Sequence, residues 1–121
     1  LVDDPDASAS IERIRGDDPG MLFRGDDECS IRTLSPLHQE KSVEFYEIVL
    51  QPGARLASGA HYEGTRELFT VASGSAEVSA GSDHCPLAAG DTAHYRADVD
   101  HVIANSGAEP LRGYLVVTYT G

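Results

Sequence analysis

The chain has 121 residues, enough for one ordinary domain, and its hydrophobic content of 40% allows a packed core. Nine Lys and Arg residues stand against 20 Asp and Glu residues, giving a net charge of −11. This charge excludes a nucleic-acid-binding module and disfavours an anionic membrane surface, because both need positive charge on the protein. No apolar run is long enough for a transmembrane helix, and the acidic start is unlike a signal peptide.

Residues 1–28 form an acidic leader that holds nine of the 20 acids. Short ordered pieces at Ile11–Arg15 and Met21–Phe23 are separated by Gly-Asp-Asp turns, which predicts a largely solvated segment. The chain begins at Leu1 rather than Met. This start indicates either a processed chain or a domain cut from a longer protein.

From residue 29 onward the pattern is that of β-structure. Short runs rich in Val, Ile, Tyr, Phe and Thr alternate with Gly, Pro, Asp and Asn at about ten-residue spacing, which is typical of a sandwich or barrel. We therefore expect a single all-β unit of about eight to ten strands. The predicted strands are Ser30–Leu34, Val43–Leu50, Glu67–Ala72, Ser75–Ser79, Cys85–Ala88, Thr92–Arg96, His101–Asn105 and Leu111–Thr120.

The predicted strand Val43–Leu50 is apolar on both faces. Alternation along it places Val43 and Phe45 on one face and Ile48 and Leu50 on the other. One face suits the core of the domain. The other suits either a partner subunit, which would make a homodimer, or the central position of a sandwich in which both faces are covered.

Two later segments carry residues at paired spacings. The first runs from a Pro-Gly turn to a Glu and then a Gly, and the second runs from Gly-Asp to a His with an Asn four residues later. These residues are Pro52-Gly53, Glu67, Gly74, Gly90-Asp91, His101 and Asn105. In these spacings the chain resembles the cupin superfamily over residues 43–120. The resemblance implies an all-β cupin double-stranded β-helix, a jelly-roll barrel with a short N-terminal extension.

Three further stretches are His61-x-x-Gly64-Thr65-x-Glu67, the leading Asp3-Asp4-Pro5-Asp6 and Arg32-Thr33-Leu34-Ser35-Pro36. They resemble the C-terminal cupin sensor domains of bacterial XRE-type helix-turn-helix transcription regulators. This closer resemblance implies a cupin barrel over 29–121. Residues 1–28 are then an extension or linker from an absent DNA-binding domain, and DNA is contacted only through that domain.

The resemblance also implies a metal set of His61, Glu67 and His101. The family motif has two histidines before the Glu, whereas this chain has only His61 there. Two imidazoles and one carboxylate suit a divalent metal such as Zn, Fe, Mn or Ni and leave coordination positions open. Each residue also has a plainer interpretation: His61 as an exposed loop residue, His101 as a turn residue, and Glu67 as a carboxylate paired with a protonated histidine.

A ligand pocket is predicted inside the barrel, beside this set. Of the neighbours His94 and Tyr95 only one faces the interior, and the apolar pair of Ala93 and Tyr95 favours Tyr95. His38 and His84 are interpreted as loop residues without a role in function. The predicted pocket residues are Tyr46, Ile48, Phe69 and Tyr95.

We expect a sensor domain that binds a small molecule in the barrel and is not itself an enzyme. The alternative is a metal-dependent cupin enzyme, a dioxygenase or an isomerase, that uses the same three metal ligands. Cys29 and Cys85 lie far apart and form no Cys-x-x-Cys pair. Reduced thiols in a cytoplasmic protein are therefore expected, with a single disulfide as the alternative.

Overall fold

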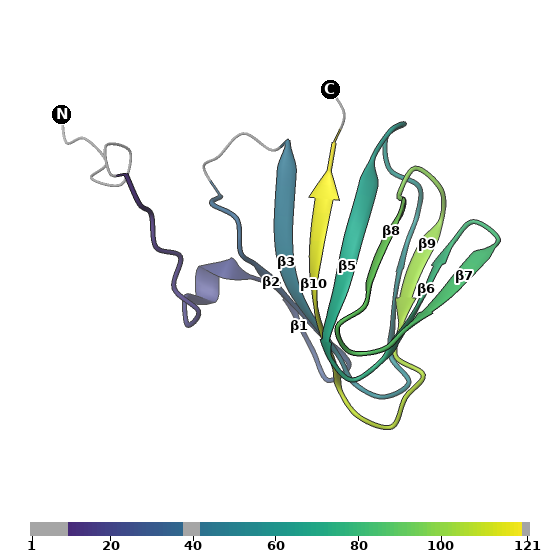
Figure 1. Cartoon of the computed structure of the whole chain (residues 1–121). Coiled ribbons are helices and arrows are strands. Elements are labelled where there is room, and N and C mark those ends of the chain that lie inside the picture. The colour runs from purple at the N-terminus through teal and green to yellow at the C-terminus, as the bar shows by residue number, and fades with distance from the viewer. Residues whose placement is uncertain (1–9, 38–41, 120–121) are drawn as a thin grey trace.

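The structure, a computed structural model, describes residues 10–37 and 42–119. Within these ranges the chain forms ten strands in two antiparallel sheets, together with a short 3₁₀ helix, η1 (Pro19–Met21) (Figure 1). The larger sheet has the order β1 (Leu22–Gly25), β2 (Cys29–Thr33), β3 (Val43–Leu50), β10 (Leu111–Thr118), β5 (Arg66–Ser73), β8 (Thr92–Arg96). The smaller sheet has the order β4 (Arg55–Ser58), β9 (His101–Ala104), β6 (Ala76–Ala80), β7 (Asp83–Leu87).

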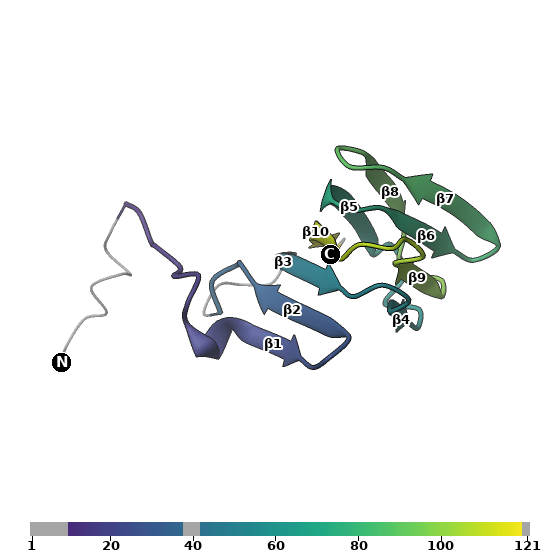
Figure 2. The same ribbon diagram turned by 90° about the horizontal axis from the view of Figure 1, so that it is seen from below.

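After β3 the chain passes repeatedly between the two sheets. β4 lies in the smaller sheet, β5 in the larger, β6 and β7 in the smaller, and β8, β9 and β10 alternate between the two. Figure 2 shows β1 and β2 extending the larger sheet sideways from this double-sheet arrangement. The all-β jelly-roll fold predicted from the sequence is therefore confirmed.

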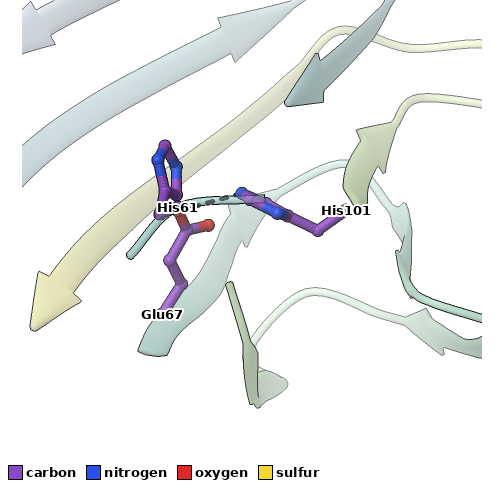
Figure 3. A group of neighbouring side chains, drawn as sticks. All are labelled: His61, Glu67 and His101. Atoms are coloured by element: carbon purple, nitrogen blue, oxygen red, sulfur yellow. Dashed lines mark ion pairs between the residues drawn. The ribbon is translucent and has the colours of Figure 1, made fainter. Parts of the chain in front are cut away.

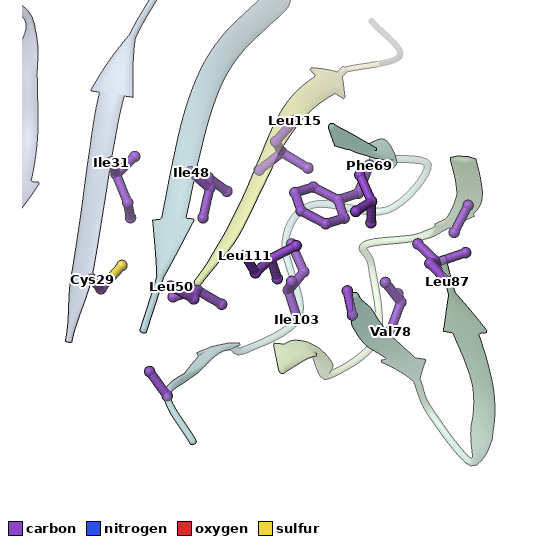
Figure 4. Packing of buried hydrophobic residues seen from close by; sticks show 14 of the residues in the cluster. Cys29, Ile31, Ile48, Leu50, Phe69, Val78, Leu87, Ile103, Leu111 and Leu115 are labelled. Carbon is purple, nitrogen blue, oxygen red and sulfur yellow. The ribbon is translucent and has the colours of Figure 1, made fainter. Parts of the chain in front are cut away.

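The core fills the space between the two sheets (Figure 4). Ile48 and Leu50 on β3 and Phe69 on β5 have no exposed surface. Burial of each such side chain contributes about 1.5–3 kcal/mol to stability. Gly113 on β10 makes room for the largest of them, because a Cβ at this position would collide with the Phe69 ring. The alternation along β3 thus separates an inward face, with Ile48 and Leu50, from an outward face, with Val43 and Phe45.

Two strands were not predicted from the sequence. β4 pairs with β9, but its four residues include a single large apolar side chain, so it carries no clear β pattern. β1 pairs with β2 at the edge of the larger sheet although Leu22 and Phe23 are 46% and 74% exposed. The larger sheet therefore begins within the acidic leader, before residue 29.

Two residues of the motifs fix a loop of the barrel. The Asn105 amide donates hydrogen bonds to the carbonyls of Leu50 (3.0 Å) and Glu109 (2.8 Å), and its side-chain oxygen accepts one from the Gly107 amide (3.0 Å). Gly74 adopts a φ of +82°, and a Cβ there would lie 2.5 Å from the Pro110 carbonyl oxygen. Both residues thus hold the loop that leads into β10.

Cys29 is buried and Cys85 is exposed, and both thiols are free. In the described part of the chain, no helix has the length and hydropathy needed to cross a membrane.

Candidate functional site

The three predicted metal ligands converge in the structure (Figure 3). Glu67 lies on β5 of the larger sheet, His101 begins β9 of the smaller sheet, and His61 lies in the connection from β4 to β5. One ligand atom from each residue lies within 4.8 Å of those of the other two. Residues far apart in the chain meet here because inward positions of facing strands share one interior.

The Glu67 carboxylate is at the centre of this cluster and is 4% exposed. Its Oε1 accepts a hydrogen bond from the Tyr95 hydroxyl at 2.8 Å. Its Oε2 lies 3.2 Å from Nε2 of His101 and 3.8 Å from Nε2 of His61. Burial, and then the charge of Glu67, raise the pKa of Tyr95, so this hydroxyl remains a proton donor. Tyr95 therefore fixes one carboxylate oxygen while the other faces both imidazoles.

The His101 ring is held by its other nitrogen. Nδ1 lies 2.8 Å from the Val99 carbonyl oxygen, which can only accept, so this nitrogen carries a proton. Nε2 is buried, and among the described residues the one polar atom beside it is Oε2 of Glu67, at 3.2 Å. In a neutral ring the Nε2 lone pair would face the carboxylate directly. A cation, either a proton on Nε2 or a metal ion, resolves this conflict.

The pKa of His101 reflects this arrangement. The interaction with Glu67 raises the pKa above 6.5, burial acts in the opposite direction, and the Val99 carbonyl adds to the rise. A proton and a metal ion would therefore compete for the same nitrogen.

His61 belongs to a loop that is held against the loop after β8. The His61 amide donates to the Ala97 carbonyl at 2.8 Å, the Ala97 amide donates to the Thr65 carbonyl at 2.9 Å, and the Gly64 amide donates to Oδ2 of Asp98 at 3.0 Å. The imidazole is 40% exposed, and its ring centre lies 5.1 Å from that of His101. His61 is thus an exposed loop residue whose side chain nevertheless faces the buried carboxylate.

A cavity of about 200 Å³, here called the inner cavity, opens beside the cluster. Of the predicted pocket residues, Tyr46 and Ile48 line it. Phe69 lies instead in the core, and Tyr95 reaches it only through its hydrogen bond to Glu67. The apolar residues that line the inner cavity are Phe23, Ile31, Ile48, Leu56, Leu115 and Val117. The polar residues that line it are Glu44, Tyr46, Ser58, His61, Glu67 and Tyr119.

Glu44 and Tyr119 were not predicted as cavity residues. Glu44 lies two residues before Tyr46 and four before Ile48, so the alternation of β3 places it on the inward face. An acidic residue on an otherwise apolar inward face is the signal that would have identified it. The predicted strand Leu111–Thr120 would have placed Tyr119 on the same face as Leu115 and Val117, although β10 itself ends at Thr118.

A second and larger hollow of about 660 Å³ lies between the edge strands β7 and β8, and we call it the seam hollow. Its lining includes Arg66, His84, His94 and Tyr95. His94 is exposed and Tyr95 is 7% exposed, as predicted from their alternation. His84 is exposed, while His38 lies outside the described residues. Among the described residues, His61, Glu67 and His101 are the one group arranged to hold a metal ion.

The donor atoms of this group fit a divalent metal. Two imidazole nitrogens and one carboxylate oxygen are ligands that Zn, Fe, Mn and Ni accept. The unsatisfied and buried Nε2 of His101 is the atom that a metal would complete. The Nδ1 contact with Val99 and the Tyr95 contact with Glu67 are the outer hydrogen bonds that commonly orient metal ligands.

Comparison with solved structures identifies many with the same fold. The cupin domain of an XRE family transcriptional regulator from Enterobacter cloacae is 24% identical with a TM-score of 0.71, covering 77% of this chain and 98% of that one. An HTH_3 family transcriptional regulator from Vibrio cholerae is also 24% identical with a TM-score of 0.71, covering 78% of this chain and 52% of that one. This chain thus corresponds to about half of the Vibrio protein.

A cupin 2 conserved barrel domain protein from Salinispora arenicola is 25% identical with a TM-score of 0.67, and the match covers 91% of both chains. Comparison with curated protein sequences finds no match. The family model described as "Cupin domain" matches residues 46–118, which include Glu67, His101 and most of the strands described above. The chain therefore belongs to the Cupin_2 family of cupin domains.

Proposed function

We propose that this cupin domain is the sensor module of a bacterial transcription regulator, and that it binds a small molecule in the inner cavity together with a divalent metal. One observation is the main support for this binding site. The Nε2 atom of His101 is buried beside the inner cavity, faces Glu67 Oε2 at 3.2 Å and has no other polar partner among the residues that the structure describes. A buried polar atom of this kind costs about 1–3 kcal/mol unless a proton shared with Glu67 or a bound metal ion completes its bonding.

His61, Glu67 and His101 are the residues that hold the metal in this proposal. A bound divalent metal supplies a Lewis-acidic centre to which an oxygen or nitrogen of a small molecule can bind. The chain's own groups set the rest of the site. Tyr95 orients the Glu67 carboxylate, Val99 orients the His101 ring, and the apolar walls of the inner cavity exclude water from the bound molecule.

The regulatory role is supported by the proteins that this domain resembles. The Enterobacter structure is named as the cupin domain of an XRE family regulator, and the Vibrio structure, named as an HTH_3 family regulator, extends well beyond the region matched here. In a longer protein of this kind, ligand occupancy would be transmitted as a difference in affinity between two domain arrangements. DNA would be contacted by the helix-turn-helix domain alone, in the cytoplasm.

The proposed assembly is a homodimer. The outward side chains Val43 and Phe45 of β3 are 49% and 38% exposed, and the Phe45 ring lies 6.2 Å from that of Tyr114. An apolar surface of this kind on the outer face of a sheet favours burial against a second subunit. Light scattering at micromolar concentration is expected to give twice the chain mass of 12.9 kDa. A mass of one chain would contradict the dimer.

A metal-dependent enzyme is the second candidate, favoured by the number of ligands. Three protein ligands leave coordination positions that a substrate or oxygen can occupy, which is the arrangement of catalytic rather than structural metal sites. In this case a metal-loaded sample would turn over a substrate. In the sensor, binding would instead change the affinity of the full-length protein for its operator DNA.

Metal analysis tests the shared basis of both functions. The chain is purified without a chelator and without a nickel column, and its metal content is measured by elemental analysis. We expect close to one equivalent of a divalent transition metal, and none in a variant that lacks His101. A metal-free parent that also fails to take up added Zn²⁺ would overturn the proposed site.

A further inference from the structure

Phe23 lines the inner cavity but has no part in the proposed metal site. It lies on β1, at the edge of the larger sheet, and its side chain is 74% exposed. It nevertheless belongs to the wall of the cavity, and its ring centre lies 6.4 Å from that of Tyr46. A large apolar ring that borders both a cavity and solvent gains stability when a bound molecule covers it.

The backbone of β1 is irregular at Phe23. Leu22 lies opposite Arg32 of β2. Arg24, two residues further along β1, lies opposite Ile31, which is the very next position on β2. Phe23 is therefore an extra residue in the ladder, a β-bulge. Bulges occur often beside functional sites, where they turn a side chain in a new direction, and here both Phe23 and Ile31 line the inner cavity.

The inner cavity runs across the larger sheet from Glu67 to Phe23. Strand residues of β5, β10, β3, β2 and β1 line it, and these strands are neighbours in that order. Figure 2 shows β1 and β2 extending beyond the smaller sheet, so the Phe23 end is the open one. Four strand spacings of about 4.8 Å separate β5 from β1, which is roughly 19 Å along the sheet. Side chains at both ends shorten this span, but a molecule that reaches from one end to the other must still be elongated.

Aromatic side chains are concentrated in this cavity. The chain has five Tyr and three Phe residues, and Phe23, Tyr46 and Tyr119 line the cavity. The Tyr119 hydroxyl donates to Oε1 of Glu44 at 2.8 Å, which holds this ring in place. The rings of Phe23 and Tyr46 are tilted by 58° to each other. Aromatic rings in tilted or offset contact attract one another by more than their buried area alone provides, so this lining favours an aromatic guest.

We propose that the ligand of the inner cavity is an elongated molecule with a metal-binding head group at one end and an aromatic ring at the other, and that Phe23 contacts this ring. This inference rests on the proposed function, since it names the class of molecule that the cavity takes. The cavity has a volume of about 200 Å³, and an apolar cavity of about 150 Å³ can hold one benzene ring. The space therefore suits a single ring on a short chain, with the head group beside His61 and Glu67.

Three hydroxamic acids with the same head group test the class of ligand. They are acetohydroxamic acid, 3-phenylpropanohydroxamic acid (the phenyl probe) and 3-cyclohexylpropanohydroxamic acid (the cyclohexyl probe). Calorimetry measures their affinities for the Zn²⁺-loaded protein. We expect the phenyl probe to bind at least about tenfold tighter than acetohydroxamic acid, because its chain and ring bury apolar surface in the cavity. Equal affinities of these two probes would overturn the inference.

Phe23→Ala tests the residue, and Leu22→Ala is its matched control. Leu22 is the preceding residue of β1, is also large, apolar and exposed, and is not part of the cavity lining. We expect Phe23→Ala to bind the phenyl probe about tenfold more weakly and acetohydroxamic acid like the parent. Leu22→Ala should bind both probes like the parent. Parent-like affinity of Phe23→Ala for the phenyl probe would contradict the proposed contact.

Phe23→Leu tests whether the aromatic ring matters beyond its apolar surface. This variant keeps a large apolar side chain but removes the ring. We expect the ratio of the affinity for the phenyl probe to that for the cyclohexyl probe to fall by about threefold, because the attraction between two rings is lost. The same ratio in the parent and in Phe23→Leu would rule out an aromatic preference at this position.

The outcomes separate this inference from the proposed function. If Zn²⁺ and acetohydroxamic acid bind but the phenyl probe gains nothing, the ligand class is wrong while the metal site stands. If neither Zn²⁺ nor any probe binds, both proposals fail. Light scattering of Phe23→Ala should give the same mass as the parent. A parent dimer that dissociates in this variant would show that a second subunit, and not a ligand, covers Phe23.

Discussion

The inner cavity and the seam hollow differ in how their polar groups are paired. The seam hollow is larger, at about 660 Å³ against about 200 Å³. Several of its polar side chains nevertheless bind one another or near neighbours. Arg66 Nε donates to Nε2 of His94 at 3.1 Å, and His84 Nδ1 lies 2.9 Å from the Ser79 hydroxyl. These groups are exposed and already satisfied.

The inner cavity has the opposite character. Glu67 and His101 are 4% and 3% exposed, and within the described ranges Nε2 of His101 has no partner besides its 3.2 Å contact with Glu67. Buried polar groups in proteins are nearly always paired, so each exception requires an explanation. We therefore expect an incompletely bonded, buried polar group to indicate the binding site better than the size of a hollow does.

The largest expected effect tests the buried carboxylate. Glu67→Gln keeps the side-chain volume but removes the charge that faces both imidazoles, so the fold remains and metal binding is lost. Loss of an outer hydrogen bond to a ligand costs about 10–100-fold in affinity, and loss of a ligand costs more. We therefore expect Zn²⁺ affinity, measured by calorimetry, to fall by more than about 100-fold. Parent-like affinity in a folded Glu67→Gln protein would remove Glu67 from the site.

The second prediction concerns the competition between a proton and a metal ion for Nε2 of His101. Its folded pKa is raised above 6.5 by Glu67, so protonated His101 stabilises the metal-free protein below that pH. This contribution is lost as the pH rises through the raised pKa. Zn²⁺ affinity should show the opposite trend, rising about tenfold per pH unit until the proton is gone.

Denaturant unfolding of chelator-treated protein and Zn²⁺ titrations across the same pH series measure the two trends. His101→Gln should lose the pH dependence that His101 contributes to each measurement. Unchanged pH profiles in this variant would show that His101 is not the titrating group.

A smaller effect is expected at Tyr95, which lines the seam hollow while its hydroxyl binds the carboxylate of the inner cavity. Tyr95→Phe should lower Zn²⁺ affinity about tenfold, because Glu67 loses the bond that orients it. Tyr114→Phe is the control, since that hydroxyl lies 3.4 Å from Glu47 on the outward face. If both variants bind Zn²⁺ like the parent, Tyr95 only fills space between the two hollows.

The fold was predictable wherever strands bury alternate residues. The bounds of Val43–Leu50 and Thr92–Arg96 match β3 and β8 to the residue. β8 alternates buried and exposed positions, and β3 is a run of mostly β-branched and aromatic residues that ends just before the Pro52-Gly53 turn. β1 and β4 were not predicted, because neither strand has a clear alternation of buried and exposed residues. β1 exposes Phe23, and β4 is rich in small and polar side chains, so neither has a pattern that distinguishes it from a loop.

The cluster of His61, Glu67 and His101 was predictable only through the spacing of a known family, since residue types alone left each histidine with a plainer explanation. The role of Tyr95 was not predictable, because it depends on the register that pairs Tyr95 with Glu67 across β8 and β5. The bond from Tyr119 to Glu44 likewise depends on where the end of β10 meets the start of β3. A one-residue shift in either register would place these side chains on the other face of the sheet.

The smallest expected effect tests the seam hollow itself. His84 and His94 are exposed, and each already shares a ring nitrogen with a neighbouring side chain. Neither belongs to a group of three ligating residues in the part of the chain that the structure describes. His84→Ala and His94→Ala should therefore each keep the Zn²⁺ stoichiometry of the parent, with affinity unchanged within about twofold, since isolated surface substitutions have small effects. The same calorimetric titration measures both variants, with Glu67→Gln as the reference for a lost site. A hundredfold loss in His94→Ala beside parent-like binding in Glu67→Gln would move the metal site to the seam hollow. In that case the hydrogen bonding of the polar side chains would not tell the inner cavity from the seam hollow as a binding site. The volume of the hollow would then be the better indicator.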